Sequence, residues 1–250
     1  MRKKRIYIVI LVLILISLIL LLIDKNTYKE YSKNYFYMDT YINIKINSTK
    51  SKKEIDNIFN DIDYLYCSYH KLTSRYDKYD AIVNVYYLNE ILDNNEEIVI
   101  DKRLSDIIDI GILYYDKTNG LFNIASGNLT SIWKGFIDNC DVLPSDFDVN
   151  INIDDIVLDG NKYIKYNDVK LDLGAISKGY VTELVGKYLE DNNIDSYIIN
   201  AGGNVKVGKA YNKDSYVVGI TNPDNKNDIF TKVNVNNLSI VTSGNYQRYC

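Results

Sequence analysis

The sequence predicts an α+β fold of mixed helices and a mostly antiparallel sheet, preceded by one transmembrane helix. An uninterrupted apolar stretch opens the chain, segments with helical periodicity follow, and many short strand-like segments fill the second half. Helices early and strands late along one chain are typical of an α+β domain. The roughly 225 residues after the apolar stretch suit one large domain or two small ones.

The N-terminal stretch has the length and the flanking charges of a membrane anchor. Residues 6–23 carry no charge and are almost entirely aliphatic, and four cations precede them at residues 2–5. At ~1.5 Å per residue the stretch is about 27 Å long as a helix, which spans a hydrocarbon core. Because cations favour the cytoplasmic side, we expect a single-pass protein of the cell membrane whose soluble domain is extracytoplasmic.

A cleavable signal peptide is the alternative for the same stretch. A signal peptide usually has a shorter apolar run that ends in small residues. Here the run ends in large aliphatic residues directly before Asp24. No cysteine that could carry a lipid follows it closely, since the first is Cys67. We therefore expect an uncleaved anchor over residues 1–23, a polar tether over 24–35 and one domain over 36–250.

The composition argues against one class of partner and one class of metal site. The chain carries 33 acidic against 29 basic residues, and four of the basic ones precede the apolar stretch. Because phosphate contacts need clustered Lys and Arg, we expect no nucleic-acid partner. Three cysteines without a C-x-x-C pair, Cys67, Cys140 and Cys250, predict neither a zinc site nor a disulfide framework, but scattered thiols.

The first half of the domain predicts one strand and two helices. Apolar and polar residues alternate over 36–46, which is typical of a half-buried strand. Apolar residues at helical spacing begin after Ser51 and predict a helix with one buried face. A second helix is expected over 103–116, where Asn119 and Gly120 provide the stop signal.

The second half predicts a hairpin, a third helix and further strands. Two strand-like segments, 163–166 and 169–173, flank Asn167 and Asp168 and predict a hairpin around that pair. A helix is expected over 176–190. Short strands are expected at 197–199, 205–207, 216–220, 232–235 and 239–241.

The strand-to-helix segment at 171–180 is the first candidate for a functional site. It places Gly174, Lys178 and Gly179 at the start of a helix. Free backbone N–H groups and a Lys charge at such a helix start favour a phosphate or diphosphate group. The two glycines would let a ligand approach closely, and the alternative is a tight structural turn with a solvated Lys.

Two further clusters of small residues lie downstream. Gly202 and Gly203 separate two strands, which fits either a plain hairpin turn or a backbone surface that meets a flat ligand. Thr242 and Ser243 precede Gly244 at the end of a later strand. Each cluster alone is weak evidence, and the case depends on their order and spacing.

That order and spacing resemble the FAD:protein FMN transferase family, long called thiamine biosynthesis lipoproteins. The resemblance covers residues ~36–250, and its most specific segment is D-L-G-A-I-S-K-G-Y at 172–180. The other similar segments are M-D-T at 38–40, T-S-R-Y-D at 73–77, T-N-G-L-F-N at 118–123, W-K-G-F at 133–136, N-A-G-G-N at 200–204 and T-S-G-N-Y at 242–246.

The resemblance implies a transferase that moves FMN from FAD to a Thr or Ser hydroxyl of an acceptor protein, with AMP as the leaving group. It implies Mg²⁺ as the cofactor that offsets the diphosphate charge while a hydroxyl attacks the FMN phosphorus. It also implies a flavin transferase-like fold similar to the tunnelling fold. A membrane redox subunit with a Thr or Ser flavinylation site is the kind of acceptor that the family suggests.

Carried over to this sequence, the resemblance assigns a metal ligand and a set of flavin contacts. The Ala175 carbonyl would bind the metal, Lys178 would add charge at the diphosphate, and Tyr76 would stack on the isoalloxazine. For Tyr76 the alternative is an ordinary half-buried aromatic. The residues expected to contact the cofactor are Met38, Tyr76, Asp172, Gly174, Lys178, Gly179, Glu183, Gly202, Gly203 and Ser243.

The sequence also departs from the family pattern. Asn123 and Ala125 stand where the family has an acid and a hydroxyl, and Glu183 stands where it has an Asp. The family continues beyond the position of Cys250 with a histidine base and further metal ligands, so we expect a C-terminally truncated domain.

No catalytic residue is assigned, because His70, the only histidine, is expected to be exposed or to cap a helix rather than to replace the base. The alternatives to an active transferase are an extracytoplasmic FAD-binding or partner-binding protein without catalysis, and a solute-binding lipoprotein.

Overall fold

A computed structural model of the chain describes residues 4, 7–8, 10–17, 27–140, 148–225 and 227–244. The described residues form an α+β domain whose named strands all pair antiparallel, in sheets of five, three and two strands. The largest sheet has the order β1-β2-β6-β7-β10. The predicted class of mixed helices and mostly antiparallel sheet is therefore confirmed.

A long hairpin forms one edge of the largest sheet. It consists of β1 (Lys29–Tyr37) and β2 (Thr40–Ser48), which pair along their whole lengths. Met38 and Asp39 make the turn with φ of 53° and 54°. A turn with positive φ at both central residues matches the right-handed twist of the two strands, so it favours a tight hairpin.

This hairpin corrects two expectations. The stretch 36–46, predicted as one strand, contains the end of β1, the turn and most of β2. Residues 29–35, expected in a tether, belong to β1. The strand was missed because β1 buries only Tyr35 fully, so its apolar alternation is too weak to stand out.

The strands of the second half lie where they were expected. β6 (Ser196–Ala201) pairs with β2, β7 (Asn204–Val207) pairs with β6, and β10 (Leu238–Val241) pairs with β7. β8 (Tyr216–Thr221) and β9 (Ile229–Val235) form a separate two-stranded sheet. Val207 on β7, Tyr216 on β8 and Val235 on β9 share a small second core, which joins the two sheets.

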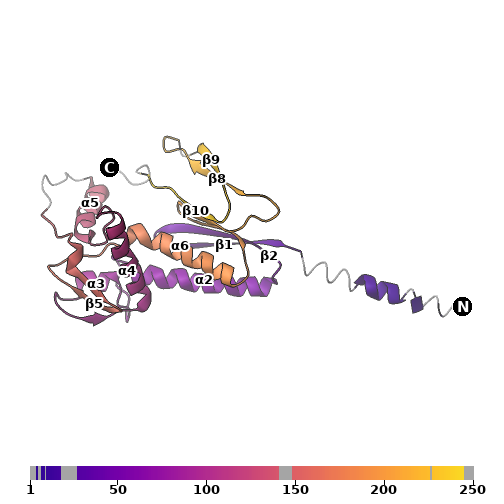
Figure 1. Ribbon diagram of the computed structural model, residues 1–250, viewed down its shortest axis with the longest axis horizontal. Coiled ribbons are helices and arrows are strands. Elements are labelled where there is room, and N and C mark those ends of the chain that lie inside the picture. The colour runs from indigo at the N-terminus through magenta and orange to yellow at the C-terminus, as the bar shows by residue number, and fades with distance from the viewer. Residues whose placement is uncertain are drawn as a thin grey trace.

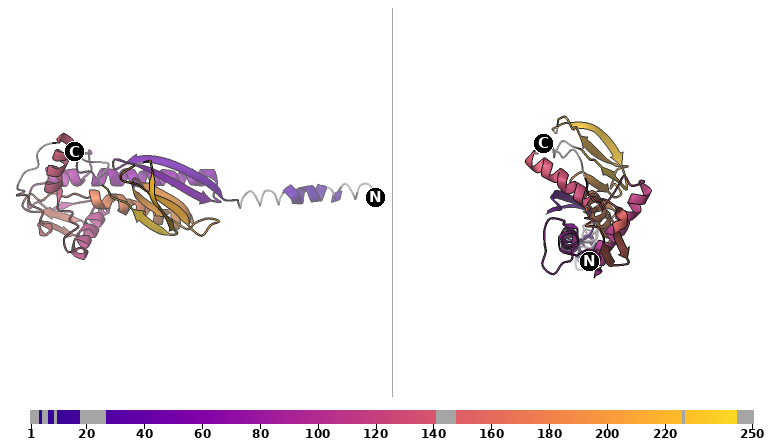
Figure 2. Two further views of the ribbon diagram at one scale, coloured as in Figure 1. Left: turned by 90° about the horizontal axis from the view of Figure 1, so that it is seen from above. Right: turned by 90° about the vertical axis from the view of Figure 1, so that its left-hand side faces the viewer.

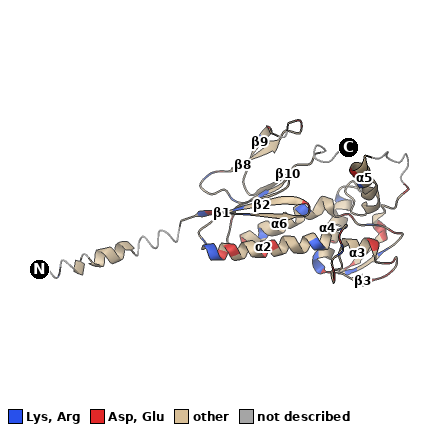
Figure 3. Cartoon of the chain, turned by 180° about the vertical axis from the view of Figure 1, so that it is seen from behind, with Lys and Arg blue, Asp and Glu red and all other residues tan. Residues whose placement is uncertain are grey.

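Two long helices cover one face of the largest sheet. They are α2 (Lys52–Thr73) and α6 (Gly174–Asp191), which run side by side beneath β1, β2 and β6 (Figures 1 and 2). The main core lies between these helices and the sheet and includes Ile42, Ile44 and Ile199, each at most 2% exposed. Helix α2 begins with two Lys residues, carries only acidic charges from Glu54 to Asp63, and has Lys71 near its end (Figure 3).

The sequence fixes the start of α2 locally. Ser51 accepts a hydrogen bond from the Glu54 N–H, and the Glu54 carboxylate accepts one from the Ser51 N–H. This capping box satisfies two backbone donors at the helix start. The buried residues of α2 recur at helical spacing, as expected: Ile55, Ile58, Phe59, Ile62, Tyr66, Tyr69 and Leu72.

The remaining elements form a second lobe at one end of the long helices (Figure 1). Its helices and strands are α3 (Val85–Glu90), α4 (Lys102–Lys117), α5 (Gly127–Asn139), a 3-10 turn (Ile153–Asp155), β3 (Ile98–Val99), β4 (Ile156–Asp159) and β5 (Lys162–Lys165). Helix α4 ends where Gly120 adopts a φ of 80°, which confirms the predicted stop. Neither α3 nor α5 was expected.

The predicted hairpin around Asn167 and Asp168 was wrong. The two residues do form a turn with positive φ, but β5 pairs with β4 and β3. The segment after the turn makes one parallel bridge, from Lys170 to Ser126. The Asn89 side chain accepts a hydrogen bond from the Leu171 N–H and donates one to the Leu171 carbonyl. Leu171 therefore satisfies its backbone hydrogen bonds without a strand partner.

Two further expectations concern the membrane and the cysteines. Among the residues that the structure describes, no helix is both long and apolar enough to cross a membrane. Part of the predicted anchor at 1–23 lies outside the described residues. Cys140 is disulfide-bonded and Cys67 is a free thiol. The prediction of scattered thiols was therefore wrong for Cys140, because an odd cysteine count still permits one bridge.

Candidate functional site

A cavity of about 300 Å³ lies where the β1–β2 turn, the end of α2 and the start of α6 meet. Five of the expected site residues line it: Met38, Tyr76, Asp172, Gly174 and Lys178. His70 and Arg75 line it as well, and neither was expected to. Residues from positions 38 to 178 of the chain therefore converge on one small polar cavity.

A second cavity, of about 490 Å³, lies along α2 beside the start of α4 and contains none of the expected residues. Its walls include Cys67, Lys71 and Arg103, and the Arg103 side chain is paired with Asp101. Size alone does not mark a functional site. The smaller cavity is the better candidate because several polar groups point to one helix start there.

The start of α6 offers fewer free donors than the sequence indicated. The Gly174 N–H donates to the Asp172 carboxylate at 2.8 Å, and the N–H groups of Ile176 and Ser177 donate to the Leu173 carbonyl at 3.1 and 2.9 Å. Among the described residues, the Ala175 N–H is the one first-turn donor with no protein acceptor. The helix dipole and this one N–H still favour an anion.

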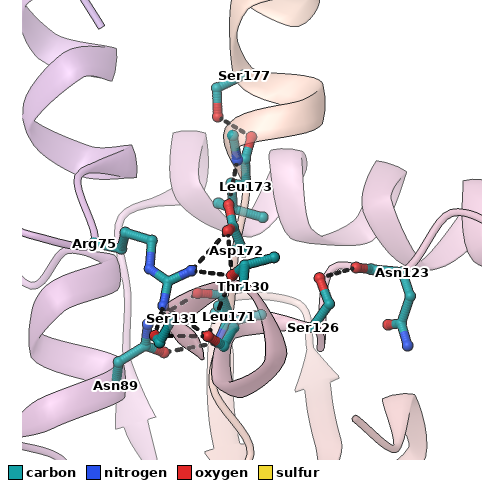
Figure 4. A network of polar contacts seen from close by, with 12 residues as sticks. Arg75, Asn89, Asn123, Ser126, Thr130, Ser131, Leu171, Asp172, Leu173 and Ser177 are labelled. Atoms are coloured by element: carbon teal, nitrogen blue, oxygen red, sulfur yellow. Dashed lines mark hydrogen bonds and ion pairs between the residues drawn. The ribbon is translucent and has the colours of Figure 1, made fainter. Parts of the chain in front are cut away.

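Arg75 organises the polar wall of the cavity (Figure 4). Its side chain is buried, and its guanidinium donates to the Asp172 carboxylate at 2.6 Å, to the Gly127 carbonyl at 2.8 Å and to the Ser131 hydroxyl at 2.6 Å. It also bonds to the Thr130 hydroxyl. Arg75, in the loop after α2, therefore joins the start of α5 to the segment before α6.

The Asp172 carboxylate is fully engaged by this network. It accepts from Arg75, from the Thr130 hydroxyl at 2.7 Å and from the Gly174 N–H. Burial opposes its ionisation, but the hydrogen bonds from Thr130 and Gly174 together with the Arg75 charge outweigh that effect and hold the pKa of Asp172 below its usual value. Arg75 offsets the charge of Asp172, so the carboxylate does not leave the helix start electronegative.

Lys178 supplies positive charge on the α6 side of the cavity. Its side chain is half-buried one turn into the helix, and it makes no ion pair with any residue in the described part of the chain. A Lys held at a helix start without a carboxylate partner is free to bind a ligand phosphate.

Tyr76 presents an aromatic surface at the cavity wall and is 54% exposed. The Arg75 guanidinium lies 5.3 Å and the Lys134 ammonium 5.5 Å from its ring centroid. Cations near a ring face are attracted to its electron density. The ring is exposed rather than half-buried, and its stacking on a flavin stays a prediction that rests on the resemblance.

Four of the expected residues do not line the cavity. Gly179 lies opposite the Asn204 side chain of β7, and the Glu183 carboxylate pairs with the Lys206 ammonium at 2.6 Å. Gly202 and Gly203 make the β6–β7 turn with φ of 60° and 94°.

The two turn glycines are explained by packing. A Cβ on Gly202 would lie 2.4 Å from the Thr40 hydroxyl oxygen, and one on Gly203 would lie 3.1 Å from the Thr242 carbonyl oxygen. Ser243, the last of the expected contacts, follows β10 and is exposed. For these residues the flavin contact remains a prediction that rests on the resemblance.

The described residues do not form a Mg²⁺ site by themselves. No three His, Cys, Asp or Glu side chains gather among them in a way that would hold a metal. Asp172 is already bonded to Arg75, and the Ala175 carbonyl is a single backbone ligand. Mg²⁺ prefers one or two carboxylates together with phosphates and water.

Fold and cavity together define a class of protein: an α+β domain with a polar cavity at a helix start, where the helix dipole and a Lys favour an anionic ligand. The chain belongs to the ApbE family, whose sequence profile matches residues 38–250. The match begins at Met38, in the turn that lines the cavity, and covers every expected site residue. The resemblance found in the sequence is confirmed.

Curated relatives of the chain carry the name FAD:protein FMN transferase. One from Klebsiella pneumoniae (strain 342) is 30% identical over 138 residues, which cover 51% of this chain and 42% of the relative. One from Buchnera aphidicola subsp. Schizaphis graminum is 27% identical over 230 residues, which cover 85% of this chain and 64% of the relative. The chain thus spans 42% to 64% of the length of these relatives.

Two solved structures share the fold. The ApbE protein from Thermotoga maritima has a TM-score of 0.72 at 20% identity, covering 89% of this chain and 72% of that one. The flavin transferase ApbE from Vibrio cholerae has a TM-score of 0.68 at 20% identity, covering 88% and 72%. At this identity the likeness establishes the fold, which is that of flavin transferases as expected.

Proposed function

We propose that this chain is a FAD:protein FMN transferase that moves FMN from FAD to a Thr or Ser hydroxyl of an acceptor protein. The observation that carries the proposal is the convergence of three family-like segments on one cavity. The turn after β1 contributes Met38, the loop after α2 contributes Arg75 and Tyr76, and the start of α6 contributes Gly174 and Lys178. The names of the relatives support flavin transfer as the activity.

In this reaction the acceptor oxygen attacks the FMN phosphorus and forms a new P–O bond. The P–O bond to AMP breaks, AMP leaves with the bonding electron pair, and the hydroxyl proton is lost to a base. Lys178 and the start of α6 would stabilise the charge that develops on the diphosphate. Arg75 would contribute by neutralising Asp172 beside the same helix start.

Mg²⁺ dependence belongs to this proposal on the strength of the family resemblance alone. The metal would offset diphosphate charge in the bound substrate. The Ala175 carbonyl is the metal ligand that the resemblance implies, and among the described residues no three His, Cys, Asp or Glu side chains gather to hold the ion.

The proposed setting is the outer face of the cell membrane. The cations at 2–5 and the apolar stretch 6–23 support a single-pass anchor with the domain outside. There the acceptor would be a protein with a Thr or Ser flavinylation site, such as a membrane redox subunit. The alternative is an extracytoplasmic protein that binds FAD or a partner without transferring FMN.

Two measurements on the purified full chain test the proposal. Titration with FAD, followed by flavin fluorescence, measures binding. In-gel flavin fluorescence of a Thr-bearing acceptor, incubated with FAD and Mg²⁺, measures transfer. FAD binding with labelling supports the transferase, and FAD binding without labelling supports the FAD-binding alternative. Absence of FAD binding contradicts both of these and leaves the partner-binding protein.

Lys178→Ala is the informative variant for this site. It should weaken FAD binding by about 1–3 kcal/mol, the range for a hydrogen bond to a charged group, and leave the circular dichroism spectrum unchanged. Lys187→Ala, an exposed position on the same helix, is the matched control and should bind FAD like the wild type. Unchanged affinity in Lys178→Ala would mean that the segment is a structural turn.

A further inference from the structure

The only histidine of the chain is bonded on both ring nitrogens. His70 lies in the last turn of α2 and lines the cavity. The Met38 N–H donates to its Nδ1 at 3.2 Å, and the Tyr79 hydroxyl lies 3.2 Å from its Nε2. One side chain therefore ties α2 to the β1–β2 turn and to the loop that follows α2.

These partners fix the protonation state of the ring. A backbone N–H can only donate, so Nδ1 must be the unprotonated nitrogen. The neutral imidazole then carries its proton on Nε2 and donates it to the Tyr79 oxygen. The one basic nitrogen of His70 is already occupied by Met38.

The turn that His70 holds is an unusual one. Met38 adopts a φ of 53° and Asp39 one of 54°, although neither is a glycine. The left-handed region costs most residues roughly 1–2 kcal/mol, and Met has no short polar side chain to offset that cost. Such a conformation persists where surrounding contacts enforce it, and the bond from Met38 to His70 is one of those contacts.

We propose that His70 is a positioning residue that holds the Met38–Asp39 turn as one wall of the candidate flavin cavity, facing the start of α6. It is not the general base of the reaction, because accepting a proton at Nδ1 would break its bond to the Met38 N–H. The role in flavin binding rests on the proposed function, whereas the link between His70 and the turn does not.

The tautomer can be read directly by NMR. The full chain, labelled with ¹⁵N-histidine, contains one imidazole, so its two ring nitrogens need no further assignment. At a pH where the ring is neutral we expect an unprotonated, pyridine-like Nδ1 and a protonated, pyrrole-like Nε2. A protonated Nδ1, or averaging between the two tautomers, would overturn the proposal.

Substitutions separate the two ring nitrogens. The Asn amide oxygen in His70→Asn falls near the position of Nδ1, and the Gln amide in His70→Gln falls near Nε2, whereas His70→Phe reproduces neither. Loss of the hydrogen bond from Met38 in His70→Phe should weaken FAD binding about 3- to 10-fold. His70→Asn should recover most of that loss and His70→Gln should not. Recovery by Gln alone would contradict the assignment.

Kinetics distinguish a positioning residue from a base. His70→Phe should raise KM for FAD and leave kcat for transfer nearly unchanged, because the chemistry does not use the ring. A large fall in kcat with unchanged FAD affinity would instead identify His70 as the base. If His70→Phe does not fold, the comparison of His70→Asn with His70→Gln still decides between the two nitrogens.

Hydrogen exchange makes the result independent of flavin. The Met38 amide should exchange faster in His70→Phe than in the wild type and be protected again in His70→Asn. Tyr79→Phe is the matched control, because it removes only the Nε2 partner and should leave the Met38 amide protected. A wild type that binds no FAD would refute the proposed function, while this exchange pattern would still test the link to the turn.

Discussion

Arg75 is the side chain on which the polar wall of the cavity depends. Its buried guanidinium donates hydrogen bonds to Asp172, Gly127 and Ser131 from two nitrogens. A Lys, with a single ammonium nitrogen, could not reproduce this geometry. We did not predict this role, although Arg75 lies within the T-S-R-Y-D segment that matched the family. A sequence shows that an Arg is present, but not that three distant segments meet at it.

Arg75→Met should destabilise the fold strongly. It leaves the largely buried Asp172 without its cation, and breaking one partner of a buried ion pair costs about 3–5 kcal/mol. Urea denaturation measures the change in the free energy of unfolding. Lys209→Met, which removes an exposed pair with Asp195, is the control and should cost less than about 1 kcal/mol. Similar small losses in both variants would contradict the role given to Arg75.

Asp172 makes a prediction about acid stability. Its pKa in the folded state is lowered, so the stabilisation it provides is present above the unfolded pKa of about 3.9 and is lost as the pH falls through the lower folded value. Asp172→Asn should be less stable than the wild type at pH 7 and show a shallower loss of stability below about pH 4. Urea midpoints measured at pH 7 and at several values below about pH 4 test this prediction. Parallel curves of midpoint against pH for the two proteins would exclude it.

At the scale of elements, the sequence was informative where local chemistry sets the structure. The capping box at Ser51 and the positive φ at Gly120 depend on residues a few positions apart, so both helix ends could be predicted. Helix α5 has no side-chain cap hydrogen bond at Ser126, and Gly127 packs against the Lys170 backbone. Its start depends on a segment far along the chain, which local patterns do not reveal.

The same distinction applies to the site. The sequence placed Gly174 and Lys178 at the start of a helix because a helix start is a local feature, although the segment before it is not a strand. Whether Gly202 serves a ligand or a turn depends on what lies opposite, and the structure places Thr40 there. Glu183 likewise faces Lys206 on β7, a pairing set by how α6 packs on the sheet.

The β6–β7 turn can be tested for a purely structural role. Gly202→Ala should destabilise the protein for two reasons, since φ is 60° and the new Cβ would lie 2.4 Å from the Thr40 hydroxyl oxygen. Gly160→Ala is the matched control, because Gly160 has the same φ of 60° and no atom within 4 Å of the added Cβ. It should lose only the roughly 1–2 kcal/mol of the left-handed backbone.

Removing the neighbour should then help one variant and not the other. Thr40→Ala in the Gly202→Ala background should recover part of the extra loss, and in the Gly160→Ala background it should recover none. Chemical denaturation of the four proteins provides the comparison. Equal losses in the two single variants would mean that packing against Thr40 is unimportant at Gly202.

For the molecule as a whole, one core joins both lobes. A single cluster of buried side chains includes Ile44 of β2, Tyr66 of α2, Leu104 of α4, Tyr163 of β5 and Val185 of α6. It therefore connects the sheet and long helices with the lobe of α3, α4 and β5 in a continuous interior. Length and composition left one large domain or two small ones open, and the shared core favours one.

A continuous core predicts one cooperative unfolding transition that FAD shifts as a unit. A ligand that binds only the folded state stabilises it by about 2.7 kcal/mol at a concentration 100 times its Kd. Calorimetry of the full chain should show one transition for the domain, at a higher temperature with FAD than without. Lys178→Ala should keep the single transition and show a smaller shift at the same FAD concentration. Two transitions, with only one moved by FAD, would mean that the lobes unfold separately and that the cavity belongs to one of them alone.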